Sequence, residues 1–201
     1  MNDETPNMTS SFAPINRWHI VISGFMQTEG KPTGMVKLWR IMRLFTHPSV
    51  GVEIRSWCSN WSDMAELIWR CQPDSGAVDV RIYAYSWGGF SAMLLAKELG
   101  ERGIDVSAMV LSDPVYRHWY RLGWWRAFVP WRRIVVPPNV RRVWWFRQRE
   151  NFPRAHGLVA KSKERTLIYE PVLLERFHEY MDDAAAFHEQ ALIVGHAGEH
   201  M

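Results

Sequence analysis

Apolar and polar positions follow two different rhythms along the chain. Short, almost unbroken apolar runs, typical of strands buried on both faces, occupy residues 18–25, 50–57, 78–85 and 106–112. Side chains that are apolar every third or fourth position, as in amphipathic helices, occupy residues 35–45, 62–70 and 90–99. Strands that alternate with helices predict an α/β fold with a mostly parallel central sheet and helices on both faces.

Helix-capping residues set the expected ends of two of these helices. Ser62 or Asp63 is expected near the N-cap of the second helix, and Gly100 and Gly103 end the third. The alternation then breaks after residue 113. Further strands are predicted at residues 141–148 and, interrupted by a proline, at 166–177, which brings the sheet to about six strands. Residues 182–194 predict a closing helix. Its first two residues are aspartates, whose negative charge is favourable at the positive N-terminal end of a helix.

Ser86 is the most informative polar position. It follows an apolar strand pattern and precedes two glycines and a helical pattern, which predicts a strand, a sharp turn and a helix. Strand and helix approach each other closely at such a turn, so the residues two before and two after must be small, as Ala84 and Gly88 are. Ala-x-Ser-x-Gly is a variant of the Gly-x-Ser-x-Gly nucleophile elbow, which presents a serine hydroxyl to a general base.

Three side chains with complementary chemistry follow the ends of predicted strands: Ser86, Asp113 and His178. The carboxyl ends of parallel strands share one edge of a sheet, so we expect these side chains to meet there. A hydrolytic serine needs an imidazole to take its proton and a carboxylate to orient that imidazole. The chain order Ser, Asp, His is that of α/β-hydrolases.

Other residues compete for two of these roles. Glu150 lies just past the strand predicted at 141–148 and is an alternative acid, since Asp113 also suits a turn before a proline. The other histidines considered lie in a loop, in the closing helix or near the chain end: His156, His188, His196 and His200. His178 is favoured because it ends a strand segment.

Four segments within residues 18–194 read Val-Ile-Ser-Gly-Phe (21–25), Ala-Tyr-Ser-Trp-Gly-Gly (84–89), Leu-Ser-Asp-Pro-Val-Tyr-Arg (111–117) and Phe-His-Glu-Tyr-Met-Asp-Asp (177–183). Together they resemble the α/β-hydrolase superfamily, in particular its small lipase- or esterase-like serine hydrolases. The resemblance implies a compact α/β-hydrolase fold with Ser86 as nucleophile, His178 as base and Asp113 as acid. It implies neither a metal nor an organic cofactor.

An oxyanion hole needs two backbone N–H donors. Trp87, at the start of the helix after Ser86, is expected to supply one. The turn after the first strand is expected to supply the other, from Phe25 or, next, Met26. Met26, Tyr85 and Tyr116 are the candidate substrate contacts.

The segment from residue 117 to residue 149 contains nine Arg, six Trp and no acidic residue. It is interpreted as a cap over the site inserted at about 117–140, as a small packed subdomain, or as a basic surface for nucleic acid or anionic membrane. Two functions follow. One is a serine hydrolase of a small-molecule ester or thioester; the other is a non-catalytic binding protein that uses this segment.

Length and composition indicate the number of domains, the location and the state of the cysteines. With 201 residues, 47% of them hydrophobic, the chain fits one domain at 16–195 between tails at 1–15 and 196–201. It contains no run of about 20 apolar residues and begins without a basic and apolar leader, so a cytoplasmic location is the default expectation. Cys58 and Cys71 have no metal or redox spacing and are expected as free thiols. Monomer and dimer both remain open.

Overall fold

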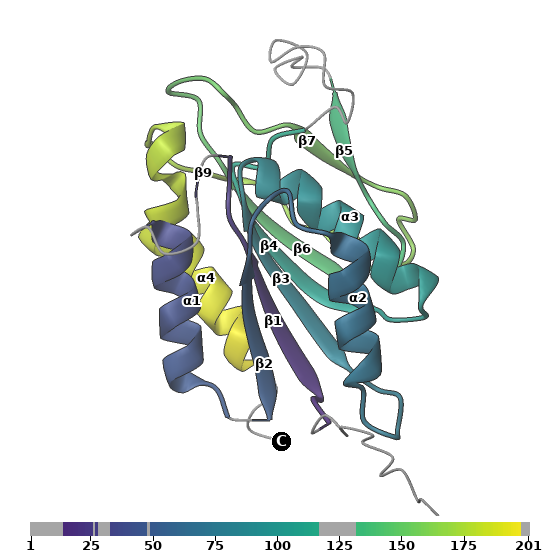
Figure 1. The fold of residues 1–201 in the computed structure, drawn as a ribbon. Helices are drawn as coiled ribbons and strands as arrows, with labels where there is room; N and C mark the ends of the chain where they lie inside the picture. The colour runs from purple at the N-terminus through teal and green to yellow at the C-terminus, as the bar shows by residue number, and fades with distance from the viewer. Residues whose placement is uncertain (1–13, 26, 28–32, 48, 117–131, 198–201) are drawn as a thin grey trace, which may run out of the picture.

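The computed structural model describes residues 14–25, 27, 33–47, 49–116 and 132–197 of the chain. Seven strands form one sheet in the order β2-β1-β3-β4-β6-β8, with β9 also paired to β6, and all these pairings are parallel (Figure 1). The strands are β1 (Arg17–Ile22), β2 (Val50–Arg55), β3 (Asp79–Tyr85), β4 (Val106–Ser112), β6 (Arg142–Arg147), β8 (Leu167–Ile168) and β9 (Val172–Leu173). The predicted parallel sheet is confirmed, and the architecture is that of the α/β-hydrolase fold.

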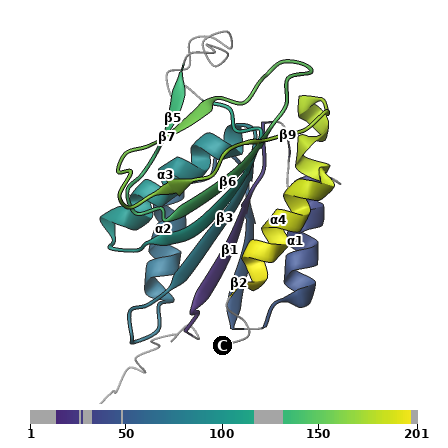
Figure 2. The same ribbon diagram turned by 180° about the vertical axis from the view of Figure 1, so that it is seen from behind.

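Helices cover both faces of this sheet (Figures 1 and 2). On one face lie α1 (Gly34–Phe45) and α4 (Ala185–His196), and on the other α2 (Trp61–Arg70) and α3 (Trp87–Glu101). Side chains of β3 point alternately to the two faces: Val80, Ile82 and Ala84 pack under α2 and α3, and Tyr83 and Tyr85 under α1 and α4. Because both faces are buried, the strand sequences are almost continuously apolar.

Arg81 is a charged exception within β3. Its side chain is buried, and its guanidinium donates to the carbonyl oxygens at the end of α4, those of Val194, Gly195 and Ala197. The same group lies 2.5 Å from a carboxylate oxygen of Asp79. Burial raises the pKa of Asp79, but hydrogen bonds from Arg81 and Ser107 and the charges of Arg81 and Arg17 outweigh it and hold the pKa below its usual value.

Several element boundaries differ from those expected. The N-cap of α2 is Asn60, whose side chain accepts from the backbone N–H of Ser62 at 3.1 Å, and Ser62 and Asp63, expected near the cap, lie in the first turn just after it. Helix α3 begins at Trp87, directly after Ser86, three residues earlier than predicted. The closing helix begins only at Ala185, because a 3-10 helix, η2 (His178–Asp183), precedes it and contains both aspartates assigned to the helix start.

Much of the predicted cap and of both tails lies outside the described residues, including 1–13, 117–131 and 198–201. Within 132–140 the chain forms β5 (Arg133–Val136), which pairs in parallel with β7 (Gly157–Ala160) as a second, two-stranded sheet that was not predicted. The amide of Ile15, at the end of the predicted N-terminal tail, donates to the carbonyl of Cys71 at 2.8 Å. Both cysteines are free thiols, as expected.

Candidate active site

Ser86 stands at the turn between β3 and α3 with φ 53° and ψ −123°. A positive φ is strained for any residue other than glycine and persists only where the surroundings hold it. Here the Ser86 N–H donates to the Ser112 carbonyl at 3.0 Å, and its own carbonyl accepts from the N–H groups of Gly89 and Val115, each at 2.9 Å. The turn is thereby bonded on both sides to the end of β4 and the loop after it.

The small residues around Ser86 are required by close backbone approach. A Cβ at Gly88 would lie 2.7 Å from the carbonyl oxygens of Ile22 and Ser23, and one at Gly89 would lie 2.5 Å from the Cβ of Pro114. Both distances are shorter than any real carbon contact, so α3 can leave the turn at this angle only with glycine at these positions.

The structure brings Ser86, His178 and Asp113 together at the carboxyl edge of the sheet. Ser86 Oγ lies 2.8 Å from His178 Nε2, and His178 Nδ1 lies 2.5 Å from Asp113 Oδ2. All three residues are buried among the described residues, and Asp113 is fully so. Since a carboxylate only accepts hydrogen bonds, the proton of the neutral imidazole belongs on Nδ1, and Nε2 is left to accept from the serine hydroxyl.

Asp113 is held by donors from a loop that sequence reasoning did not single out. Its Oδ1 accepts from the backbone N–H of Gln148 at 3.2 Å and of Ala155 at 3.1 Å. Its Oδ2 accepts from the side-chain amide of Gln148 at 3.1 Å as well as from His178. Four donors thus compensate the buried carboxylate and fix which oxygen faces the imidazole.

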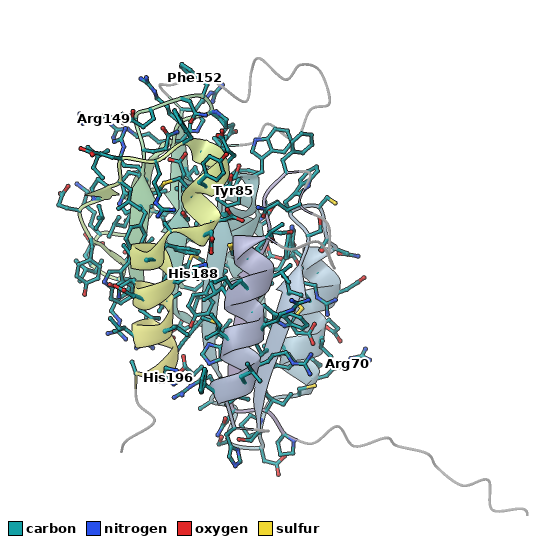
Figure 3. The ribbon with its side chains drawn as sticks, turned by 90° about the vertical axis from the view of Figure 1, so that its left-hand side faces the viewer. Arg70, Tyr85, Arg149, Phe152, His188 and His196 are labelled. Carbon is teal, nitrogen blue, oxygen red and sulfur yellow. The ribbon has the colours of Figure 1, made fainter. Side chains whose placement is uncertain are left out.

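His178 is fixed by its main chain. Its N–H donates to the side-chain oxygen of Asn151 at 2.7 Å, and its carbonyl accepts from the Tyr85 hydroxyl at 2.8 Å. Burial, together with nearby carboxylates, raises the pKa of Tyr85 above its usual range, so the phenol stays a donor. Figure 3 shows Tyr85 toward the same end of the molecule as Arg149 and Phe152, with His196 at the opposite end. Tyr85, a predicted substrate contact, is buried beside His178.

The competing residues lie elsewhere. Glu150 is exposed, although it follows β6 as expected. His156 is buried, and its Nδ1 accepts from the backbone N–H of Tyr116 at 3.0 Å. His188 donates from Nε2 to the Asp182 carbonyl at 2.8 Å, and burial lowers its pKa in spite of that bond. His200 lies outside the described residues.

The two predicted oxyanion donors belong to neighbouring segments. Trp87 is the first residue of α3, and Phe25 lies on the turn after β1, which pairs with β3 in the register Ile22 to Ala84. The rings of Phe25 and Trp87 have centroids 4.3 Å apart, so the two segments touch. Met26, the other candidate donor and a predicted substrate contact, lies outside the described residues.

A third aromatic ring joins this pair. Trp57 packs edge-on against Phe25 and Trp87 at centroid distances of 5.6 and 5.2 Å. Its carbonyl accepts from the Ser91 hydroxyl of α3 at 2.5 Å, which fixes the loop after β2 beside the elbow. Sequence reasoning missed Trp57 because it placed this residue inside the strand predicted at 50–57, whereas β2 ends at Arg55. We call Phe25, Trp57 and Trp87 the aromatic wall.

A cavity of about 740 Å³ runs along α3, and Ser86 is not among the residues that line it. Tyr116, the third predicted substrate contact, lines one end of it, where its ring packs edge-on against Phe90 at 5.0 Å. Within the described ranges, no group of three or more His, Cys, Asp or Glu could hold a metal ion. None of the described helices is long and apolar enough to cross a membrane.

No protein-family model and no curated protein matches this sequence. Among solved structures, the chain is similar to the Vlm2 thioesterase domain bound with a dodecadepsipeptide, at 13% identity and a TM-score of 0.44, over 94% of this chain and 98% of that one. It is also similar to ClbQ from the colibactin NRPS/PKS pathway, at 12% identity and a TM-score of 0.47, over 92% and 97%. A third similar structure is RedJ with a PEG molecule bound in its active site, at 12% identity and a TM-score of 0.46, over 92% of this chain and 90% of that one. These likenesses are distant, and they assign neither a family nor an activity to this chain.

Proposed function

We propose that the protein is a serine hydrolase that cleaves a carboxylic ester or thioester through an acyl-enzyme intermediate. The observation that carries the proposal is the continuous contact from Ser86 Oγ through His178 to Asp113, at 2.8 and 2.5 Å. It occurs where the main chain holds Ser86 at a strained, positive φ. Such strain is typical of a functional site and is costly elsewhere.

In the proposed mechanism, Ser86 Oγ attacks the substrate carbonyl carbon while His178 Nε2 takes the hydroxyl proton. Asp113 stabilises the imidazolium that forms. The carbonyl oxygen becomes an oxyanion that accepts from the backbone N–H groups of Trp87 and Phe25. His178 then gives its proton to the leaving oxygen or sulfur as the bond to the acyl carbon breaks, and the acyl group stays on Ser86.

Water completes the cycle. A water molecule gives a proton to His178 Nε2 as its oxygen attacks the acyl carbon, and the second tetrahedral intermediate uses the same two N–H donors. When that intermediate collapses, the bond to Ser86 breaks, His178 returns the proton to Oγ, and the carboxylic acid leaves. Every proton in this scheme passes through Nε2, which is why the Nδ1 tautomer matters.

From the aromatic wall we infer that the part of the substrate nearest Ser86 is an apolar acyl group. Phe25, Trp57 and Trp87 are half-buried and stand on the segments that flank Ser86. Aromatic rings bind apolar groups through a large contact area at small entropic cost. The acyl side is therefore proposed to be apolar for esters and thioesters alike.

Active-site labelling tests the proposal directly. The folded protein should react with a fluorophosphonate probe, and Ser86→Ala should abolish the label. Ser107→Ala is the matched control, because Ser107 bonds to Asp79 within the sheet and should label like wild type. Turnover of p-nitrophenyl butyrate and of the butyryl thioester of N-acetylcysteamine should be lost in Ser86→Ala and His178→Ala. A folded wild-type protein that does not label would instead favour the non-catalytic binding protein.

A further inference from the structure

The turn after β1 is closed by Gln27. The Gly24 N–H donates to the Gln27 side-chain oxygen Oε1 at 3.0 Å, and the Gln27 N–H donates back to the Gly24 carbonyl at 3.2 Å. The Ser23 hydroxyl also lies 3.3 Å from the Gln27 carbonyl. Gln27 therefore shapes the turn that includes Phe25 with both its main chain and its side chain.

Asp182 holds the other end of this side chain. Gln27 Nε2 donates to Asp182 Oδ2 at 2.7 Å, and the backbone N–H of Gly34 donates to the same oxygen at 2.8 Å. Asp182 is only 4% exposed and belongs to η2, the 3-10 helix that begins with His178. A Cβ on Gly34 would lie 2.3 Å from the Asp182 main chain, so the start of α1 packs tightly against η2.

These contacts determine the orientation of the Gln27 amide. Its oxygen faces an N–H donor, and its NH2 group faces a carboxylate that only accepts. A flipped amide would set donor against donor at Gly24 and acceptor against acceptor at Asp182. Both contacts would be lost together, so Asp182 secures the acceptor that the turn needs.

We propose that Gln27 and Asp182 act as a pair of positioning residues that fix the turn carrying the Phe25 N–H, and so the oxyanion hole, to the helix that carries His178. The inference rests on the proposed function. Asp182 lies four residues after His178, so one short helix holds both the imidazole and the turn. Misplacing a catalytic group by about 1 Å can cost 10²-fold, which sets the scale of the expected effect.

Gln27→Ala and Asp182→Ala should each lower kcat for p-nitrophenyl butyrate about 10- to 100-fold, with KM changed less than about twofold. An oxyanion donor acts in the transition state, so its misplacement lowers kcat and kcat/KM alike. Gln190→Ala on α4 and Asp183→Ala are the matched controls. Asp183 adjoins Asp182 but is exposed and pairs with Lys37 at 2.9 Å, so its loss should leave kcat within about twofold of wild type.

An exchange of donor and acceptor separates positioning from a general loss of structure. Gln27→Glu keeps an acceptor for Gly24 but sets two carboxylates against each other, and should lose activity like Gln27→Ala. Adding Asp182→Asn supplies an NH2 donor to the new carboxylate but sets that NH2 against the Gly34 N–H, so it should restore kcat in part, to at least about fivefold above Gln27→Glu. Melting temperatures are recorded for every variant, and the exchange remains informative if an alanine variant fails to fold.

The outcomes distinguish the two proposals. A wild type that neither labels nor turns over would overturn the proposed function, and this inference with it. A wild type that labels, with folded Gln27→Ala at a kcat within twofold, would overturn the inference alone. A folded double variant, Gln27→Glu with Asp182→Asn, that is no more active than Gln27→Glu would also overturn the inference alone.

Discussion

Replacing Asp113 with asparagine keeps the shape of the side chain and reverses one hydrogen bond at the site. Oδ1 accepts two backbone N–H groups, at 3.2 and 3.1 Å, so the asparagine oxygen must stay at that position. The asparagine NH2 group then faces His178 Nδ1, which has to accept. The imidazole proton moves to Nε2, and a protonated Nε2 cannot take the proton of Ser86.

The expected loss is large because the fold is retained while the tautomer is wrong. In serine proteases the corresponding change lowers kcat about 10⁴-fold, which at 1.36 kcal/mol per factor of ten is about 5.4 kcal/mol. Gln148 Nε2 also donates to the carbonyls of Asn151 and Pro153, at 3.0 and 2.9 Å, so it keeps partners in the variant. We therefore expect Asp113→Asn to fold and to bind substrate with nearly unchanged KM.

The assay compares Asp113→Asn with Glu150→Gln on p-nitrophenyl butyrate, with circular dichroism as the check on folding. Glu150 is exposed, and its variant should keep kcat within about twofold of wild type. A folded Asp113→Asn that retains more than a tenth of wild-type kcat would refute the tautomer reasoning. Loss of activity in Glu150→Gln alone would show that the acid was assigned to the wrong residue.

Three further predictions concern the fold that supports the site. Gly88→Ala should lower the free energy of unfolding by about 2–3 kcal/mol in urea titrations, because the added Cβ meets two carbonyl oxygens at the end of β1. Gly157→Ala is the control: its added Cβ would make one contact, at 3.9 Å, and should lower the free energy of unfolding by less than about 0.5 kcal/mol. Arg81→Met should cost about 3 kcal/mol, since it leaves the carbonyls at the end of α4 and a carboxylate without their shared donor; an unchanged midpoint would refute this. The pKa of Asp79 is lowered in the folded state, so its ionised form stabilises the fold at pH values above the unfolded-state pKa of about 3.9. The difference in free energy of unfolding between wild type and Asp79→Asn should therefore shrink as the pH falls through and below that value. A difference that does not change with pH would contradict this prediction.

Much of the fold follows from periodicity because its elements are long and buried on both faces. The run that becomes β3 and the repeat that becomes α1 each contain enough residues for their spacing to be distinctive. By contrast, β5 and β7 have four residues each, too few to separate a strand from a loop. The start of α4 was predicted too early because Asp182 and Asp183 also suit a helix N-terminus.

The candidate site, like the fold, was predictable from the sequence only in part. Ser86, Asp113 and His178 were selected because each follows a strand, and topology brings such positions to one edge. Their supporting residues, Gln148 and Asn151 among them, lie in loops, where polar residues have no period to distinguish them. Gln27 and Asp182 are 155 positions apart, and only the folded chain reveals that they touch.

The 92 positions between Ser86 and His178 also set an order of events during synthesis. At roughly 5–20 residues per second, a ribosome polymerises the serine about 5–18 s before the histidine. Until α4 follows, the apolar side chains of β4 that it covers, Val110 among them, lack the helix that packs on β4 in the folded chain. A nascent chain therefore has its nucleophile early but no base to activate it. During the same interval it presents a sheet face that chaperones would recognise.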